Sequence, residues 1–403
     1  MHRETPDDLI VLVPGFLGFE SIFNVHYFGK LVAERLELAL KNEHGIATEV
    51  HVARTLPAAR LDRRRERLVG SLRARLRGRR RTPRIHLVGH STGGLDAYAL
   101  ATGLYPSDAP DEPAIRDCIR TVVTLGAPMC GTSIVRARAV REARGPWFAL
   151  RMLASFPAEA RHAVLTDPLT RAIVLDLAPR PWHALRYAYE LATDDALLDD
   201  LDPDASAWVC PPHRDGLAIA HYVTLAAGSW CPPSSIERPN GHGTLYESFI
   251  GLVQDGQRHL SRVRRAARWP AIASRIESGD VIASAEGRSK LDGVSDAASD
   301  GVVDSALQVV RIEDLRGVVI ADHLDVVGHY RDGGAPRAQG HTALLQSEVG
   351  FLHSGSGFGH VEHHELWRSI ADVIANRLRP RPMRGVRETL RRSIRSGLES
   401  VMR

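Results

Sequence analysis

The sequence predicts an α/β protein with a mostly parallel central sheet and helices on both faces. Its first 130 residues alternate between short apolar runs and longer amphipathic stretches, the pattern of consecutive strand–helix units. A Gly-His-Ser-Thr-Gly-Gly turn separates one apolar run from the helical stretch that follows it. With 403 residues and 44% hydrophobic content, the chain can form one large domain with insertions or two domains.

The N-terminal part predicts four strands separated by three helices. The first strand is a continuous apolar run that ends in Pro-Gly, as a buried parallel strand does. The first helix has one apolar face, and Gly45 is expected to end it; that face comprises Phe28, Leu31, Val32, Leu36 and Leu40. The expected strands are 9–16, 46–53, 85–89 and 119–128, and the expected helices are 27–45, 60–84 and 92–103.

The remainder predicts two more strands and several helices. Residues 130–200 lack clear strand patterns, whereas 219–230 and 317–323 are apolar enough for strands. Helical patterns cover 243–277 and 361–378. We therefore expect an α/β core formed by 1–129 and 216–380, with a helical cap or lid at 130–215, a second helical insertion at about 240–295, and a basic tail at 381–403.

The formal net charge of +4 is carried almost entirely by arginine, concentrated in residues 60–84 and in the C-terminal tail. The first segment predicts a solvated helix face, because leucines recur at helical spacing among the arginines; they are Leu61, Leu68, Leu72 and Leu76. For the tail, a solvated appendage and a contact with an anionic membrane surface both stay open. No nucleic-acid partner is expected, and the sequence indicates no oligomeric state.

The chain has no apolar run of 18 residues and no recognisable signal peptide at its N-terminus. The sequence therefore predicts a cytoplasmic protein, with peripheral membrane contact as the alternative. Four cysteines are too few for a disulfide scaffold, and we expect free thiols; they are Cys118, Cys130, Cys210 and Cys231.

Residues 89–93, Gly-His-Ser-Thr-Gly, match the G-x-S-x-G nucleophile elbow of α/β-hydrolases, with a strand expected before the turn and a helix after it. Glycines on both sides of the serine let the strand and the helix approach closely. The helix N-terminus supplies partial positive charge where an oxyanion forms. The motif predicts Ser91 as a nucleophile; a purely structural turn of small residues is the alternative.

A serine nucleophile requires a base, an orienting carboxylate and two oxyanion donors. In this fold the donors are backbone N–H groups of the residue after the nucleophile and of a loop after an early strand. This predicts Thr92 and, from the loop Pro14–Gly18, Phe16. The alternative for this loop is an ordinary strand-ending turn.

The acid and the base are expected in the order Ser, Asp, His along the chain. Asp300 precedes a glycine where a loop enters an apolar run, which favours it as the acid over Asp304 and Asp296. His323 directly follows a predicted strand, which favours it as the base over His329.

At these motifs the sequence resembles the bacterial true lipases, secreted triacylglycerol lipases of the α/β-hydrolase superfamily. The similar stretches occur in the same order over about half of the chain; they are LVPGFLGFESIFNVHYFGKL, IHLVGHSTGG, TLGAPMCGTS, HYVTLAAGSW, SDGVVDSALQ and DHLDVVGH. The resemblance implies the same catalytic and oxyanion residues. Two positions depart from it: Pro14 replaces a histidine, and Thr92 replaces a larger residue.

The resemblance also implies a structural calcium near the histidine loop, with Asp325 as one ligand and Asp280 as the only candidate for a second carboxylate. The alternative is that Asp325 bonds the backbone of its own loop. No other cofactor is expected.

The expected function is that of a serine ester hydrolase, a lipase or esterase acting on lipid-like acyl esters. The alternatives are a phospholipase or acyltransferase with the same acyl-enzyme, and a non-catalytic α/β-hydrolase that serves as a binding module. Residues 130–200 have the position of a lid, whose apolar face would comprise Trp147, Phe148, Leu150, Met152, Leu153 and Phe156. Ordinary cap packing is the alternative for those side chains.

Overall fold

A computed structural model describes most of the chain. The described residues are 7–16, 18, 21–22, 25–79, 81–104, 109–145, 148–166, 189–190, 194–204, 214–231, 243–261, 265–330, 352 and 354–375. Trp147, Cys210 and the tail at 381–403 lie outside them, as do the side chains of Leu150 and Leu153. No helix in the described part is both long and apolar enough to span a bilayer.

A seven-stranded sheet forms the centre of the molecule, and each pair of neighbouring strands in it is parallel. Its order is β4-β1-β5-β6-β7-β9-β8. The strands are β1 (Asp8–Val13), β4 (Thr48–Val52), β5 (Arg84–His90), β6 (Ile119–Leu125), β7 (Ala218–Leu225), β8 (Val281–Ile282) and β9 (Leu315–Ile320). A separate antiparallel pair is formed by β2 (Ser21–Ile22) and β3 (Val25–His26). The six predicted strands are confirmed, whereas the two-residue edge strand β8 was not predicted.

The continuous apolar run of β1 supplies both faces of the sheet. Leu9, Val11 and Val13 belong to one hydrophobic cluster, and Ile10 and Leu12 belong to another. Successive side chains of a strand point to opposite faces, so a strand buried on both sides has no polar positions.

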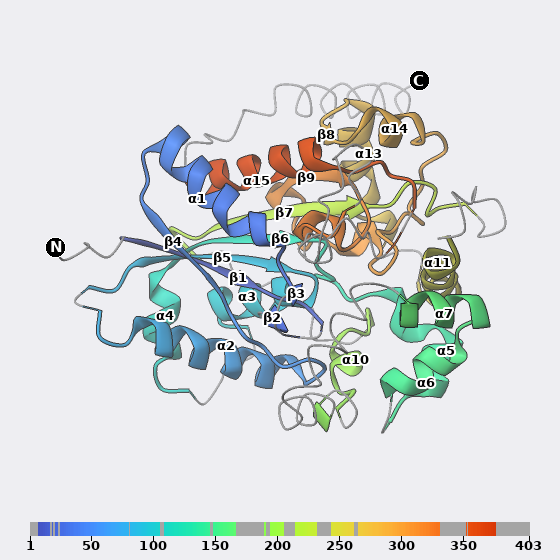
Figure 1. Ribbon diagram of the computed structural model, residues 1–403, viewed down its shortest axis with the longest axis horizontal. Helices are drawn as coiled ribbons and strands as arrows, with labels where there is room; N and C mark the ends of the chain where they lie inside the picture. Colours follow the sequence, from blue (N-terminus) through green and yellow to red (C-terminus); the bar gives the residue numbers. More distant parts are fainter. Residues whose placement is uncertain are drawn as a thin grey trace, which may run out of the picture.

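Helices cover both faces (Figure 1). One face is covered by α1 (Lys30–His44) and α15 (His360–Ile374), and the other by α2 (Leu61–Leu76), α3 (Thr92–Thr102) and α4 (Glu112–Cys118). As predicted, α1 ends at Gly45, which has a φ of 68°. Leu31 is 50% exposed, so its predicted place on the buried face was wrong; the buried stripe of α1 runs through Val32, Leu36 and Leu40.

The remaining helices lie beside the sheet or at one end of it. Near β8 and β9 are α13 (Trp269–Glu277) and α14 (Ala285–Ser289). The cluster at one end consists of α5 (Arg138–Ala143), α6 (Phe148–Ser155), α7 (Ala158–Thr166) and α11 (Gly243–Arg258), to the right in Figure 1. Short helical segments are η1 (Ser133–Arg136), α10 (Leu197–Asp200), η3 (Ser305–Leu307), η4 (Ile312–Asp314) and η5 (Asp325–Val327).

Two segments far apart in sequence form this helical cluster. Helix α11 packs on η1, α5 and α7, and the rings of Phe156 and Phe249 meet at 5.6 Å. Phe148 and Met152 pack against the core cluster that also contains α2 and α3. In this structure the described members of the predicted lid face are therefore in contact with the rest of the protein.

The arginine-rich helix α2 is not solvated in the way we expected. Its leucines 61, 68 and 72 are buried as predicted, but Arg64 and Arg65 are buried too, each with 0% exposure. They follow Leu61 by three and four residues and therefore share its face of the helix. Buried carboxylates compensate them: Asp96 for Arg64, and Glu112 at 3.2 Å for Arg65.

Candidate active site

Ser91 lies in a sharp turn between β5 and α3. Its φ of 53° and ψ of −134° make it the only non-glycine residue with positive φ in the described part of the chain. Two glycines allow the close approach: a Cβ on Gly89 would lie 2.3 Å from the Gly93 carbonyl oxygen, and one on Gly93 would lie 2.2 Å from that of Val13. The backbone therefore holds Ser91 in a strained conformation, as the elbow motif requires.

The turn lies where the strand order of the sheet reverses. The chain leaves β1 for β4 on one side and then returns to β5 on the other side of β1. In open parallel sheets, ligands bind outside the carboxyl ends of the strands at such a point. The loop after β1 touches the serine turn here, since a Cβ on Gly15 would lie 2.6 Å from the Ser91 Cβ. Phe16 follows in this loop and is partly buried against the core.

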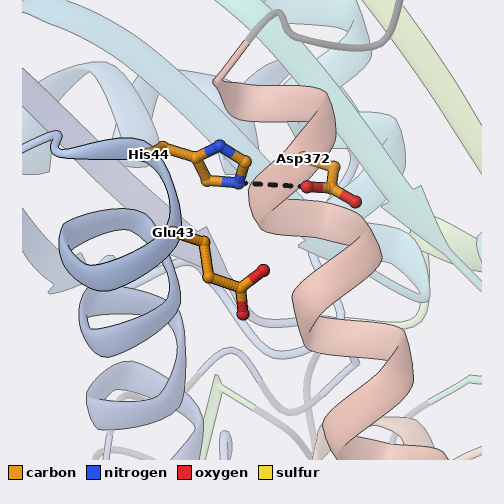
Figure 2. Close-up of side chains that lie close together, drawn as sticks. All are labelled: Glu43, His44 and Asp372. Carbon is orange, nitrogen blue, oxygen red and sulfur yellow. Dashed lines mark ion pairs between the residues drawn. The ribbon is translucent and has the colours of Figure 1, made fainter.

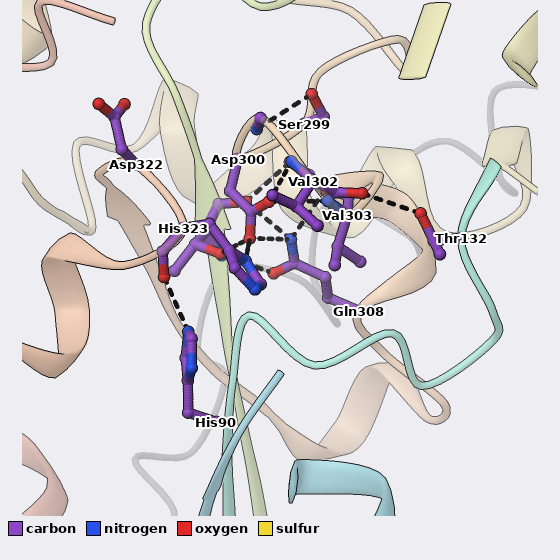
Figure 3. Close-up of polar contacts among 12 residues, drawn as sticks. His90, Thr132, Ser299, Asp300, Val302, Val303, Gln308, Asp322 and His323 are labelled. Carbon is purple, nitrogen blue, oxygen red and sulfur yellow. Dashed lines mark hydrogen bonds and ion pairs between the residues drawn. The ribbon is translucent and has the colours of Figure 1, made fainter. Parts of the chain in front are cut away.

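His323 and Asp300 form a buried pair (Figure 3). His323 Nδ1 lies 2.8 Å from Asp300 Oδ2, and the His323 backbone N–H donates to the Asp300 carbonyl at 3.0 Å. A carboxylate only accepts hydrogen bonds, so Nδ1 carries a proton, and the neutral form of this imidazole has its lone pair on Nε2. This tautomer is the one that a general base needs.

The Asp300 carboxylate is fully buried and held by other donors. Oδ1 accepts from the backbone N–H groups of Val302 at 3.0 Å and Val303 at 2.8 Å. Oδ2 accepts from Thr224 Oγ1 at 2.6 Å and Gln308 Nε2 at 3.2 Å, in addition to His323. These bonds compensate the desolvation of a buried charge. Thr224 and Gln308 carry no spacing signal in the sequence, and we did not predict their part in the site.

The competing residues are engaged elsewhere. Asp304 accepts hydrogen bonds from the Ser133 backbone N–H at 2.7 Å and from Gln257 Nε2 at 2.7 Å. It therefore connects η1 and α11 to the loop that contains Asp300. His329 Nε2 donates to the carbonyl of Tyr27 at 2.9 Å. The structure thus pairs His323 with Asp300 rather than with Asp304.

The serine turn and the buried pair are neighbours. The Ser91 backbone N–H donates to the carbonyl of Leu125 at 3.0 Å. Gly126 follows Leu125, and a Cβ on Gly126 would lie 3.0 Å from Asp300 Oδ2 and 3.6 Å from His323 Nδ1. On the other side, the ring of His90 lies 4.7 Å from the ring of His323.

A parallel sheet whose order reverses at β1, a strained serine after β5 and a histidine after β9 together decide the architecture. The protein has an α/β-hydrolase fold. Its sequence matches no family model and no curated protein.

Three solved structures that are similar to this chain are distant from it in sequence. Lipase 1 from Pelosinus fermentans is 13% identical, with a TM-score of 0.46 over 92% of this chain and 99% of that one. The lipase of Staphylococcus hyicus is 13% identical, with a TM-score of 0.41 over 93% and 98% of the two chains. A metagenomic carboxyl esterase is 13% identical, with a TM-score of 0.43 over 93% and 77%. Such similarity carries no argument about activity, and membership of the true lipases stays a prediction.

Next to the loop after β1 lies a buried ion pair that the sequence did not reveal. Arg64 Nη2 is 2.7 Å from Asp96 Oδ2, and both side chains are fully buried. The same nitrogen lies within hydrogen-bond distance of the carbonyls of Gly15, at 3.2 Å, and Pro14, at 3.4 Å. Burial raises the pKa of Asp96, and Arg64 opposes this shift. Arg64 therefore connects α2 and α3 to the loop expected to supply an oxyanion donor.

Thr92 is the first residue of α3 and is 3% exposed, yet its Oγ1 has no hydrogen-bond partner. A buried hydroxyl without a partner costs free energy. We expect Thr92→Val, which keeps the shape and the backbone N–H, to leave the free energy of unfolding unchanged or to raise it by about 1 kcal/mol. Urea denaturation measures this.

The matched control is Thr132→Val. Thr132 is equally buried, but its Oγ1 donates to the carbonyl of Val302 at 2.9 Å. This variant should lose about 1 kcal/mol. Equal losses in the two variants would show that the Thr92 hydroxyl makes a stabilising bond in solution.

Asp325, the expected calcium ligand, is buried in the histidine loop. Its Oδ2 accepts from the backbone N–H of Asp322 at 3.1 Å, the contact that the alternative interpretation predicts. Burial and the charge of Asp322 raise the pKa of Asp325 well above its usual range. Asp280 forms an ion pair with Arg275 instead. Asp280 is therefore not available as a second carboxylate here, and a calcium ion at Asp325 stays a prediction.

Among the described residues, one group of three side chains could hold a metal ion: Glu43, His44 and Asp372 on α1 and α15. Figure 2 shows His44 pointing at Asp372, and its Nε2 lies 3.0 Å from Oδ1 of that residue. Glu43 binds Arg368 at 2.7 Å. The two ion pairs account for the group without a cation, and it crosslinks two helices away from the carboxyl ends of β5 and β9.

Proposed function

We propose that this protein is a serine carboxylic ester hydrolase that acts on lipid-like acyl esters. The observation that carries the proposal is the Asp300–His323 bond of 2.8 Å, next to a strained serine turn at the reversal point of the sheet. A structural turn of small residues needs neither positive φ at the serine nor a buried histidine bonded to a carboxylate beside it. The lipid-like substrate rests on the order of lipase-like motifs along the sequence.

In the proposed reaction, Ser91 Oγ attacks the ester carbonyl carbon while His323 Nε2 takes the hydroxyl proton. The negative oxygen of the tetrahedral intermediate accepts hydrogen bonds from the backbone N–H groups of Phe16 and Thr92. When the C–O bond to the leaving alcohol breaks, His323 returns the proton to that oxygen. Water, deprotonated by His323, then attacks the acyl carbonyl carbon; the bond from that carbon to Ser91 Oγ breaks as His323 returns the proton to Oγ, which releases the acid and free Ser91. Asp300 stabilises the imidazolium in both halves.

The helices α5, α6, α7 and α11 are proposed as a cap over this site. One contact of this cap reaches the loop that contains Asp300: Gln257 of α11 donates to Asp304, which also accepts from Ser133 in the adjoining segment η1. A phospholipase or an acyltransferase would use the same acyl-enzyme and differ in substrate or acceptor. Product analysis in the presence of a lipid alcohol distinguishes transfer from hydrolysis.

The direct test is labelling of the folded protein with a fluorophosphonate probe, followed by mass spectrometry of the Ser91 peptide. We expect one adduct, on Ser91, that is absent in Ser91→Ala and forms far more slowly in His323→Ala. The activity of the protein toward nitrophenyl esters should fall in proportion to the fraction of Ser91 that is labelled. No adduct on folded wild-type protein would overturn the proposal and favour a non-catalytic binding module.

A further inference from the structure

We propose that Tyr27 and His90 are positioning residues that join the oxyanion loop, the serine turn and the loop of the catalytic base through one directed chain of hydrogen bonds. The inference rests on the proposed function but uses residues that the reaction itself does not require. Both side chains are buried, and neither belongs to the triad or to the oxyanion donors.

His90, the residue before Ser91, is at the centre of this series of hydrogen bonds. Its Nε2 lies 2.7 Å from the carbonyl oxygen of His323, and its Nδ1 lies 2.8 Å from the hydroxyl of Tyr27 (the bond to His323 is drawn in Figure 3). A carbonyl only accepts hydrogen bonds, so Nε2 must carry the proton. In the neutral imidazole Nδ1 is then an acceptor, and the Tyr27 hydroxyl must be the donor.

The other end of the chain is the oxyanion loop. The Tyr27 hydroxyl oxygen has one hydrogen and can still accept, and the backbone N–H of Gly15 donates to it. A Cβ on Gly15 would lie 2.6 Å from this oxygen and 2.6 Å from the Ser91 Cβ. The loop therefore contacts both the Tyr27 hydroxyl and Ser91. Each donor in the series points the same way, from the Gly15 N–H through Tyr27 and His90 to the His323 carbonyl.

Tyr27 is itself attached to the histidine loop. Its carbonyl accepts from His329 Nε2 at 2.9 Å, and the backbone N–H of Gly29 donates to Val327 at 2.7 Å. Burial lowers the pKa of His90 well below its usual range, and burial raises that of Tyr27, so both groups stay neutral at working pH. The directions of the bonds are thus constant.

The consequence is a His323 backbone held from both sides. Its N–H is bonded to Asp300 and its carbonyl to His90, which directly precedes Ser91. The imidazole of the base is therefore placed relative to the nucleophile by a side chain of the nucleophile's own turn. Loss of this link should displace the base, which lowers kcat, whereas KM should change little because both side chains are buried.

The test compares two amide replacements of His90. The amide nitrogen of Gln reaches the position of imidazole Nε2 and can donate to the His323 carbonyl, whereas that of Asn reaches only the position of Nδ1. We expect His90→Gln to keep kcat within about 3-fold of wild type and His90→Asn to lower it about 10-fold or more, each with KM within about 2-fold. Wild-type kcat in His90→Asn, or equal losses in both variants, would overturn the proposal.

Tyr27→Phe tests the other link. It keeps the ring, which packs on Phe28 at 5.4 Å, and removes only the hydroxyl shared by Gly15 and His90. His90→Gln loses only the bond from the Tyr27 hydroxyl to position 90, whereas Tyr27→Phe also removes the acceptor of the Gly15 backbone N–H in the oxyanion loop. We therefore expect kcat of Tyr27→Phe to fall about 10-fold with unchanged KM, and fluorophosphonate labelling of Ser91 to slow by a similar factor. If wild type labels and this variant labels equally fast, the positioning role is wrong while the proposed function stands; if wild type fails to label, the proposed function is wrong.

Discussion

Asp300→Asn is expected to lower kcat for ester hydrolysis by about 10⁴-fold with little change in KM. The backbone N–H groups of Val302 and Val303 both bond Oδ1, so the amide oxygen of Asn stays there and the NH₂ group takes the place of Oδ2. That group donates to His323 Nδ1 and forces the proton onto Nε2. The imidazole then cannot accept the proton of Ser91.

The measurement is steady-state hydrolysis of a nitrophenyl ester, with Ser91→Ala as the baseline. Asp304→Asn is the matched control, because Asp304 is equally buried in the same loop but bonds Ser133 and Gln257 instead of His323. It should lose stability and keep kcat within about 10-fold of wild type. A larger loss of kcat in Asp304→Asn than in Asp300→Asn would show that Asp304, and not Asp300, is the acid.

Arg64→Met is expected to lower the free energy of unfolding by about 3–5 kcal/mol, a large part of the stability of a typical domain. The substitution leaves Asp96 buried without its cation and removes donors from the carbonyls of Pro14 and Gly15. Urea denaturation measures the loss. Arg63→Met, at an exposed neighbouring position of α2, should change the value by less than about 0.5 kcal/mol.

The double variant Arg64→Met with Asp96→Leu separates the two causes. Replacing a buried ion pair with apolar side chains is often neutral for stability, so most of the lost free energy should return. We expect the double variant to hydrolyse esters more slowly than wild type, because the loop that contains Phe16 has lost the bonds from Arg64 to the carbonyls of Pro14 and Gly15. A double variant as unstable as Arg64→Met would show that the bonds to the carbonyls, rather than the unpaired charge, carry the loss.

Several parts of the fold could be predicted because their causes are local. An apolar run such as 9–16 must be a strand buried on both faces, and Gly45 can end a helix in the left-handed conformation. The edge strand β8 could not be predicted, since two residues have no periodicity. Arg64 and Arg65 were assigned to solvent on composition, although their spacing from Leu61 already placed them on the buried face.

The sequence by itself determined the α/β architecture, the serine turn and a short set of candidate acids and bases. Apolar strand segments, the glycines around Ser91 and the order of the motifs can each be recognised from residues that are close in sequence. Only the tertiary structure decided that Asp300 and not Asp304 bonds His323, and that Arg64 bonds the carbonyls of the loop proposed to supply an oxyanion donor. It alone brought Tyr27 and His90 together and set His90 on His323, 233 residues further along the chain. Which of two similar side chains meets a partner depends on how distant loops pack, and no local pattern carries that information.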